Sequence, residues 1–144
     1  MPMIDVYAPA GTFAQPEQLT KDLAAALMAI EKVPDIPLFR KNTAAFLHDI
    51  PAGHVSNVDG DGDYVRVLVL TNAGALDRDQ QLAVVRTFTD LVAAAASDAT
   101  VAERTWVQLT EAAPNRPRRV LNPTEQGAGR LPQPSWWSTA RKQP

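Results

Sequence analysis

The sequence predicts an α/β fold, a two-layer sandwich in which a four-stranded sheet carries two helices on one face. A strand pattern, a helix pattern and a second strand pattern follow one another twice within residues 1–111. The chain therefore reads as tandem β-α-β units, whose leading strands start about sixty residues apart. In such units the helices cross one face of the sheet, so the other face needs a cover that self-association would supply.

The first unit is predicted from alternation and helical spacing. Apolar and polar residues alternate over 3–8, which is typical of a strand with one buried face. Leucine and isoleucine recur every three or four residues over 16–32, and Pro16 suits the first helical position. Prolines that follow end this helix. A second strand is expected over 43–50, stopped by Pro51.

The second unit repeats the pattern with clearer signals. The run "YVRVLVL" (64–70) predicts the strongest strand of the chain. Asp77, with Gln80 three residues later, predicts a capping box at the start of a helix that runs to about Ala96. The segment "RTWVQLT" (104–110) predicts the last strand.

Composition limits the classes of function. The 144 residues are 45% hydrophobic and 21% charged, which fits one soluble globular domain. The lack of cysteine excludes disulfides and a thiolate nucleophile. We expect a cytoplasmic protein, because no signal peptide or membrane span is recognisable. A net charge of −2 gives no reason to expect nucleic acid as a partner.

The charge changes sign along the chain. Residues 1–111 carry a net charge of −7, whereas residues 112–144 carry +5 and six of the twelve prolines. We therefore predict a compact domain over 1–111 and a Pro/Arg-rich tail over 112–144. The tail is either partly disordered or docked on a neighbouring subunit through Trp136 and Trp137.

No metal or other cofactor is expected. His48 and His54 lie on a strand and in a turn without a good third ligand. The segment "DGDGD" (59–63) resembles a calcium loop in composition, but it lacks the glutamate at the twelfth position and the flanking helices. A hairpin-type connection is predicted there instead.

Pro2 stands directly before the first strand, although proline has no backbone N–H to donate. It is either an incidental residue at the strand end or a functional one. Removal of Met1 would turn Pro2 into a terminal secondary amine. An α-amine titrates near ~8, and apolar surroundings lower that value toward the range useful for abstracting a proton beside a carbonyl.

Three segments carry a family resemblance: "MPMIDVYAPAGTF" at the start, "PAGHV" (51–55) and "RTWVQLTE" (104–111). The chain resembles the tautomerase superfamily, in particular its cis-3-chloroacrylic acid dehalogenase-like and 4-oxalocrotonate tautomerase-like members. The resemblance implies a homotrimer and an amino-terminal proline, here Pro2, that acts as general base, general acid or nucleophile. It covers residues 2–111 and extends poorly into the tail.

The resemblance also shows what this chain lacks. Two arginines of the dehalogenase group fall at Asn72 and Ala75, a tyrosine falls at Gln108, and a histidine falls near Ile30. Hydrolytic dehalogenation is therefore not expected.

Six residues remain as candidates for substrate binding: Arg40, Asn72, Tyr7, Gln108, Arg66 and Glu125. Each has a plainer alternative. Arg40 can be a solvated charge in the loop before the second strand, Asn72 a turn residue, and Tyr7 a packing residue. Arg66 lies in an apolar strand and points to the open face, toward a site or an interfacial ion pair. Glu125 is the tail's only acidic residue.

Two functions follow from these observations. The first is a cofactor-independent isomerase that uses Pro2 for keto–enol tautomerisation of a small carbonyl or carboxylate substrate. The alternative is a trimeric protein of the same fold that has lost chemistry and serves binding or structure. An intact Pro2 favours the first, and the missing arginines favour the second.

Overall fold

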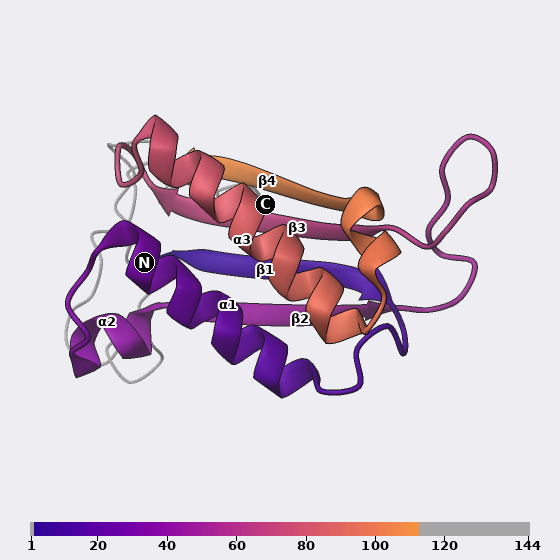
Figure 1. Cartoon of the computed structure of the whole chain (residues 1–144), viewed down its shortest axis with the longest axis horizontal. Helices are drawn as coiled ribbons and strands as arrows, with labels where there is room; N and C mark the ends of the chain where they lie inside the picture. The colour runs from indigo at the N-terminus through magenta and orange to yellow at the C-terminus, as the bar shows by residue number, and fades with distance from the viewer. Residues whose placement is uncertain (1, 113–144) are drawn as a thin grey trace, which may run out of the picture.

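The computed structural model describes residues 2–112. In chain order the elements are β1 (Met3–Pro9), α1 (Pro16–Glu31), α2 (Pro37–Asn42), β2 (Ala44–Ile50), β3 (Val65–Asn72), α3 (Arg78–Ala96), the 3₁₀ helix η1 (Ala99–Arg104) and β4 (Thr105–Ala112). The sheet has the order β2-β1-β3-β4, and α1 and α3 cover one face (Figure 1). The predicted α/β sandwich is confirmed. No helix in this part of the chain is long and apolar enough to cross a membrane.

Each β-α-β unit forms one half of the sheet. β1 pairs with β2 in parallel, β3 pairs with β4 in parallel, and the halves join through the antiparallel pair β1–β3. The two inner strands therefore begin at opposite ends of the sheet. Because β2 and β3 do not pair, the predicted hairpin connection at 59–63 is wrong: this segment joins strands that lie on either side of β1 and extends beyond the sheet (Figure 1).

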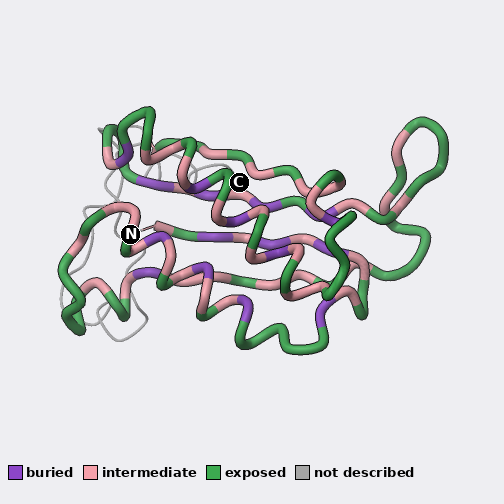
Figure 2. The backbone as a smooth tube through the Cα atoms, viewed as in Figure 1, coloured by how far each residue is buried: buried purple, intermediate pink, exposed green. Residues whose placement is uncertain are grey.

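The core lies between the sheet and the two long helices. Ile4, Val6 and Ala8 of β1 are fully buried, as are alternate valines of β3, and they meet leucines of α1 and apolar residues of α3. Figure 2 shows the buried positions concentrated along β1 and β3 and on the helix faces toward them. Burial of this apolar surface is the main stabilising contribution to the fold.

The helix boundaries follow from their sequences. Pro16 occupies the first turn of α1, where its missing N–H costs no hydrogen bond. At the start of α3, the Asp77 carboxylate accepts from the Gln80 amide and the Gln80 side chain accepts from the Asp77 amide, which confirms the predicted capping box. α1 and α3 end at Lys32 and Ser97, both in the left-handed conformation.

A short helix connects the long helix to the second strand in each unit. In the first unit this connector is α2, which replaces the loop predicted around Arg40, because Pro37 starts a new helix. In the second unit it is η1, which was also not predicted.

The face of the sheet away from the helices is open in this single chain. Met3, Phe46 and Trp106 are exposed there, on three different strands. Met3 alternates with buried residues of β1, whereas Phe46 and Trp106 alternate with partly buried residues of β2 and β4 that pack against the core, as expected for a sheet with one covered face.

Candidate active site

Pro2 lies immediately before an inner strand. Met3, the next residue, is in register with Ala44 of β2 on one side and with Leu70 of β3 on the other. Pro2 thus precedes the first paired residue, so its missing N–H removes no ladder hydrogen bond. β1 is an inner strand, and its position fixes Pro2 at one end of the sheet.

A pocket of about 430 Å³ surrounds this position. Its lining comes from the end of α1, the segment after it, α2, the end of β3 and the turn after β3. The lining residues are Pro2, Glu31, Val33, Leu38, Phe39, Asn42, Thr43, Asn72 and Ala75. A volume of this size is within the range of small-molecule sites. We call it the Pro2 pocket.

Among the described residues that line the pocket, Glu31 is the only one whose side chain ionises. It is the last residue of α1 and is half-buried. Burial raises the pKa of the Glu31 carboxyl above its ordinary value, because water is partly excluded from the charged form. The α1 carboxyl end also disfavours a negative charge.

A hydrogen bond from α3 fixes the end of α1. Gln80 donates from Nε2 to the Ile30 carbonyl at 2.7 Å, while its Oε1 accepts from the Asp77 amide at 2.9 Å. The capping residue of α3 thus also holds the backbone next to Glu31. This contact restrains the end of α1 that carries Glu31 to the Pro2 pocket.

Three neutral polar side chains complete the lining. Asn42 donates from Nδ2 to the Leu38 carbonyl at 2.7 Å, and Thr43 donates from Oγ1 to the Phe39 carbonyl at 3.1 Å. Both bonds close the end of α2. Asn72 ends β3, and its carbonyl accepts from the Ala75 amide in the following turn.

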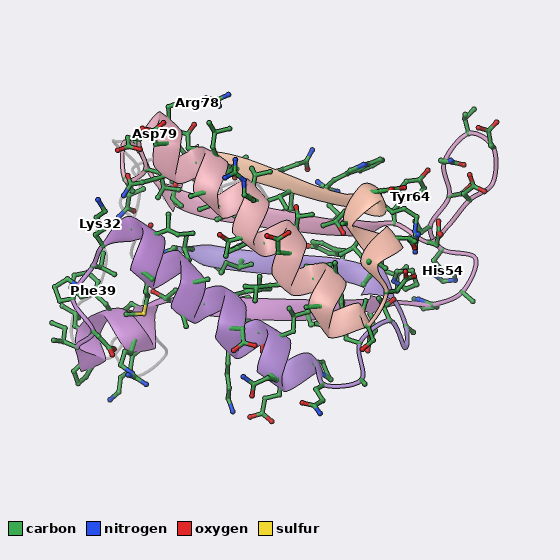
Figure 3. The ribbon with its side chains drawn as sticks, viewed as in Figure 1. Lys32, Phe39, His54, Tyr64, Arg78 and Asp79 are labelled. Atoms are coloured by element: carbon green, nitrogen blue, oxygen red, sulfur yellow. The ribbon has the colours of Figure 1, made fainter. Side chains whose placement is uncertain are left out.

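α2 contributes an apolar wall that is not packed into the core. None of its residues is buried, and the Leu38 side chain is 62% exposed. Figure 3 shows Phe39 at the same end of the molecule as Lys32, where α1 ends. An exposed leucine beside a pocket is available to contact a ligand.

The predicted site residues divide into two groups. Asn72 lies in the Pro2 pocket, and so does Ala75, the other position aligned with a family arginine. Tyr7, Arg66 and Gln108 lie elsewhere, on the open face of the sheet. Tyr7 is five residues along β1 from Pro2, which corresponds to ~16 Å of extended strand.

The open-face residues contact one another. Arg66 donates from Nε to Gln108 Oε1 at 3.2 Å, and its guanidinium lies 6.0 Å from the centre of the Tyr7 ring. Tyr7 stacks on His48 with ring centres 4.3 Å apart, and His48 Nε2 is 2.7 Å from Asp5 Oδ1. We call these five residues the open-face network.

Arg40 and Glu125 are not brought to the Pro2 pocket by the described structure. Arg40 lies on α2, forms an exposed ion pair with Asp35 at 2.9 Å, and lines a second pocket of about 620 Å³ beside α1. Glu125 and the rest of the predicted tail lie outside the described residues, apart from Ala112, which ends β4. Residues 2–112 contain no group of three or more His, Asp or Glu side chains that could hold a metal ion.

The sequence did not indicate Glu31 or three of the α2 residues that line the pocket, Leu38, Phe39 and Asn42. A cation is the side chain expected to hold a carboxylate, and Glu31 has the opposite charge. The available signal was a glutamate at the carboxyl end of a helix, where the helix dipole disfavours it.

The fold of this chain is similar to that of several solved structures. No protein-family model matches the sequence, and no curated protein is significantly similar to it. A wild-type fused 4-OT, solved as a symmetric trimer, has a TM-score of 0.64 at 19% identity and covers 76% of this chain and 85% of its own.

Two further structures extend the comparison. A member of the cis-3-chloroacrylic acid dehalogenase family has a TM-score of 0.63 at 19% identity, over 76% of this chain and 74% of that one. Malonate semialdehyde decarboxylase has a TM-score of 0.58 at 14% identity, over 77% and 84%. Identities this low establish the architecture alone. The chain has the fold of the tautomerase superfamily.

Proposed function

We propose that this protein is a tautomerase-like enzyme in which Pro2, made the terminal residue by removal of Met1, transfers a proton to and from carbon. The observation that carries the proposal is the position of Pro2: it begins an inner strand and lines a pocket of about 430 Å³. The fold shared with tautomerase-superfamily structures supports it.

The chemistry follows from the lining of the Pro2 pocket. Apolar walls from Val33, Leu38 and Phe39 favour the uncharged form of a terminal amine, which can accept a proton. The Asn72 and Asn42 amides are neutral donors for a carbonyl oxygen. A proton that leaves the carbon beside this carbonyl goes to the Pro2 nitrogen, and the oxygen develops the charge of an enolate. The reverse steps convert an enol to the ketone.

We also propose that the protein assembles as a homotrimer through the open face of the sheet. Met3, Phe46 and Trp106 expose apolar surface there, and the fused 4-OT structures are described as trimers. Self-association would cover these side chains. Light scattering at micromolar concentration is expected to give three times the monomer mass, and a stable monomer would rule the assembly out.

A non-catalytic role is the second candidate. Asn72 and Ala75 stand where the dehalogenase group has arginines, and within residues 2–112 no lysine or arginine lines the Pro2 pocket. A pocket of this kind can bind a ligand without turning it over. The first candidate is preferred because Pro2 itself lies in the pocket.

Intact-mass measurement and turnover separate the two. The mass is expected to lack one methionine, and the processed protein is expected to ketonise phenylenolpyruvate or 2-hydroxymuconate. Pro2→Ala keeps a primary amine at the same place and should lower kcat/KM by about 10²–10⁴, the usual contribution of a positioned general base. Chloride release from 3-chloroacrylate is expected to be negligible.

The control is a preparation that retains Met1, in which the proline nitrogen is blocked as an amide. If it turned over enol substrates as fast as the processed protein, Pro2 would not be the base. The non-catalytic candidate would then be the better one.

A further inference from the structure

The Pro2 pocket has a carboxyl group that the proposed use of Pro2 leaves without a role. Glu31 lines the same pocket as Pro2 and is half-buried at the end of α1. No side-chain hydrogen bond or ion pair joins it to another residue of the described chain. Glu17, on the same helix, differs: it is exposed and forms an ion pair with Lys21 at 2.6 Å.

The position of Glu31 is maintained by the fold. Gln80 of α3 holds the neighbouring Ile30 carbonyl at 2.7 Å, and the left-handed turn at Lys32 ends the helix directly after Glu31. These two features restrain the backbone on either side of Glu31. The positive charge of the amino terminus lowers the pKa of the Glu31 carboxyl and so opposes the larger effect of burial. A half-buried carboxyl that lines a pocket and has such a charge nearby is a candidate for proton exchange.

We propose that Glu31 is the second proton-transfer group of this site and that the pocket takes uncharged carbonyl compounds, such as ketones, aldehydes or esters of 2-oxo acids. This inference rests on the proposed function of Pro2. It adds a role for Glu31 and a substrate class that the resemblance to carboxylate-using enzymes does not imply.

The reaction balances with these two groups alone. In the enol-to-ketone direction, the Pro2 ammonium gives a proton to carbon and the Glu31 carboxylate accepts the proton of the enol hydroxyl. The C=C bond becomes a single bond as the C=O bond forms. A proton then returns from the Glu31 carboxyl to Pro2 through solvent, which restores the starting pair. The ketone-to-enol direction reverses each transfer.

The substrate class follows from the charge of the lining. In the starting pair, the Glu31 carboxylate offsets the charge of the Pro2 ammonium, and no lysine or arginine within residues 2–112 lines the pocket. A carboxylate substrate therefore meets no net positive charge and lies beside the like charge of Glu31, which disfavours its binding. An uncharged carbonyl oxygen finds neutral donors on Asn42 and Asn72, and its apolar substituents meet Leu38 and Phe39. The pocket therefore favours a neutral, partly apolar molecule.

A matched pair of substrates tests this directly. Phenylenolpyruvate and the enol of its ethyl ester differ in the charge of the carboxyl group and in one added ethyl group, and Glu31→Gln separates the effect of the charge from that of the added apolar surface. We expect the processed protein to prefer the ester by about tenfold or more in kcat/KM, which corresponds to ~1.4 kcal/mol. Glu31→Gln should lower ester turnover by about 10²-fold or more, because the amide cannot accept the hydroxyl proton. It should also reduce the preference for the ester, because the like charge is gone.

Glu17→Gln is the control. It removes one carboxylate from the same helix at an exposed place, and it should leave both rates within about twofold. A binding measurement tests the substrate class without requiring turnover. By ligand-observed NMR, acetophenone should bind the protein more tightly than benzoate, and Glu31→Gln should reduce this difference in affinity.

The outcomes separate the two proposals. Preference for the free acid, tighter binding of benzoate, or full ester turnover by Glu31→Gln would overturn the inference. If Pro2→Ala is inactive at the same time, the proposed function survives that result. If Pro2→Ala keeps full activity, the proposed function fails as well.

Discussion

The two β-α-β units carry different connectors at corresponding places. In the parallel register, Thr43 and Pro2 of the first unit correspond to Arg104 and Tyr64 of the second. In the second unit, Arg104 ties this end together: it forms ion pairs with Asp63 at 2.8 Å and Asp98 at 3.5 Å, and it donates to Thr100 at 2.8 Å.

The connector of the first unit, α2, is packed less closely against the rest of the protein than η1 is. η1 buries Val101, whereas α2 buries none of its residues and exposes Leu38. Figure 3 shows Tyr64 and Phe39 at opposite ends of the molecule, as the antiparallel β1–β3 pair requires. The same architecture is therefore closed by ion pairs at one end and left open as a pocket at the other. The Pro2 pocket therefore lies beside the connector of the first unit, with Asn72 and Ala75 contributed by the second.

Removing the apolar wall of α2 should weaken ligand binding without unfolding the protein. Phe39→Ala is expected to lower kcat/KM for the preferred substrate by about 10- to 100-fold, through loss of apolar contact in the pocket. Its effect on the free energy of unfolding should be smaller than that of a core substitution, because no residue of α2 is buried. Kinetics combined with chemical denaturation check both parts. A large loss of stability with unchanged kcat/KM would assign Phe39 to packing.

Removing the Arg104 ion pairs at the other end of the molecule should lower stability and leave turnover nearly unchanged. Arg104→Ala breaks two ion pairs and its hydrogen bonds to Thr100 and the Asp63 carbonyl. The Arg104 side chain is only 27% exposed, so a loss of about 1–2 kcal/mol in the free energy of unfolding is expected. Turnover should stay within about twofold. Arg78→Ala, at an exposed arginine, is the control and should change stability by less than ~0.5 kcal/mol.

The smallest expected effect is a pH-dependent gain of stability in Glu31→Gln. The folded-state pKa of Glu31 is raised above its ordinary value of 4.5. Below that pH the Glu31 carboxyl is protonated in both the folded and the unfolded state. As pH rises through the folded pKa, the carboxyl ionises in a half-buried place, and the free energy of unfolding of the parent falls. Glu31→Gln has no carboxyl to ionise, so its stability does not fall in this way. It should match the parent near pH 4 and exceed it near pH 7, by less than about 1 kcal/mol because the carboxyl is partly exposed.

Urea denaturation at the two pH values measures this difference. An equal gain at both would assign the effect to something other than the ionisation of Glu31. A gain in stability accompanied by loss of ester turnover would mark Glu31 as a group retained for function.

Long elements could be predicted because their periodicity is set by the core. The alternation in β1 and β3 and the leucine spacing of α1 each follow one buried face, and the capping box marks the start of α3. α2 could not be predicted in this way, because six residues are too few to show a period. A proline after a helix predicts its end, but Pro37 also occupies the first turn of the next helix.

The candidate site was predicted only in part. Pro2 and Asn72, both named from the sequence, line one pocket. Tyr7, Arg66 and Gln108 do not, because side-chain alternation and distance along the strands place them on the open face. Glu31 and Phe39 reach the pocket through the packing of α1 and α2, which local sequence patterns do not reveal.

The register of β1 also has a practical consequence for how this protein is expressed. Strand pairing on both sides begins at Met3, so no unpaired residue separates Pro2 from the sheet. Under the proposed function, any purification tag or fusion partner joined ahead of Pro2 would convert its amine to an amide and direct the added chain into the pocket. High-throughput screens that use amino-terminal tags would then score an active enzyme as inert. A cleavable leader that leaves proline first, or a tag at the other terminus, avoids this false negative.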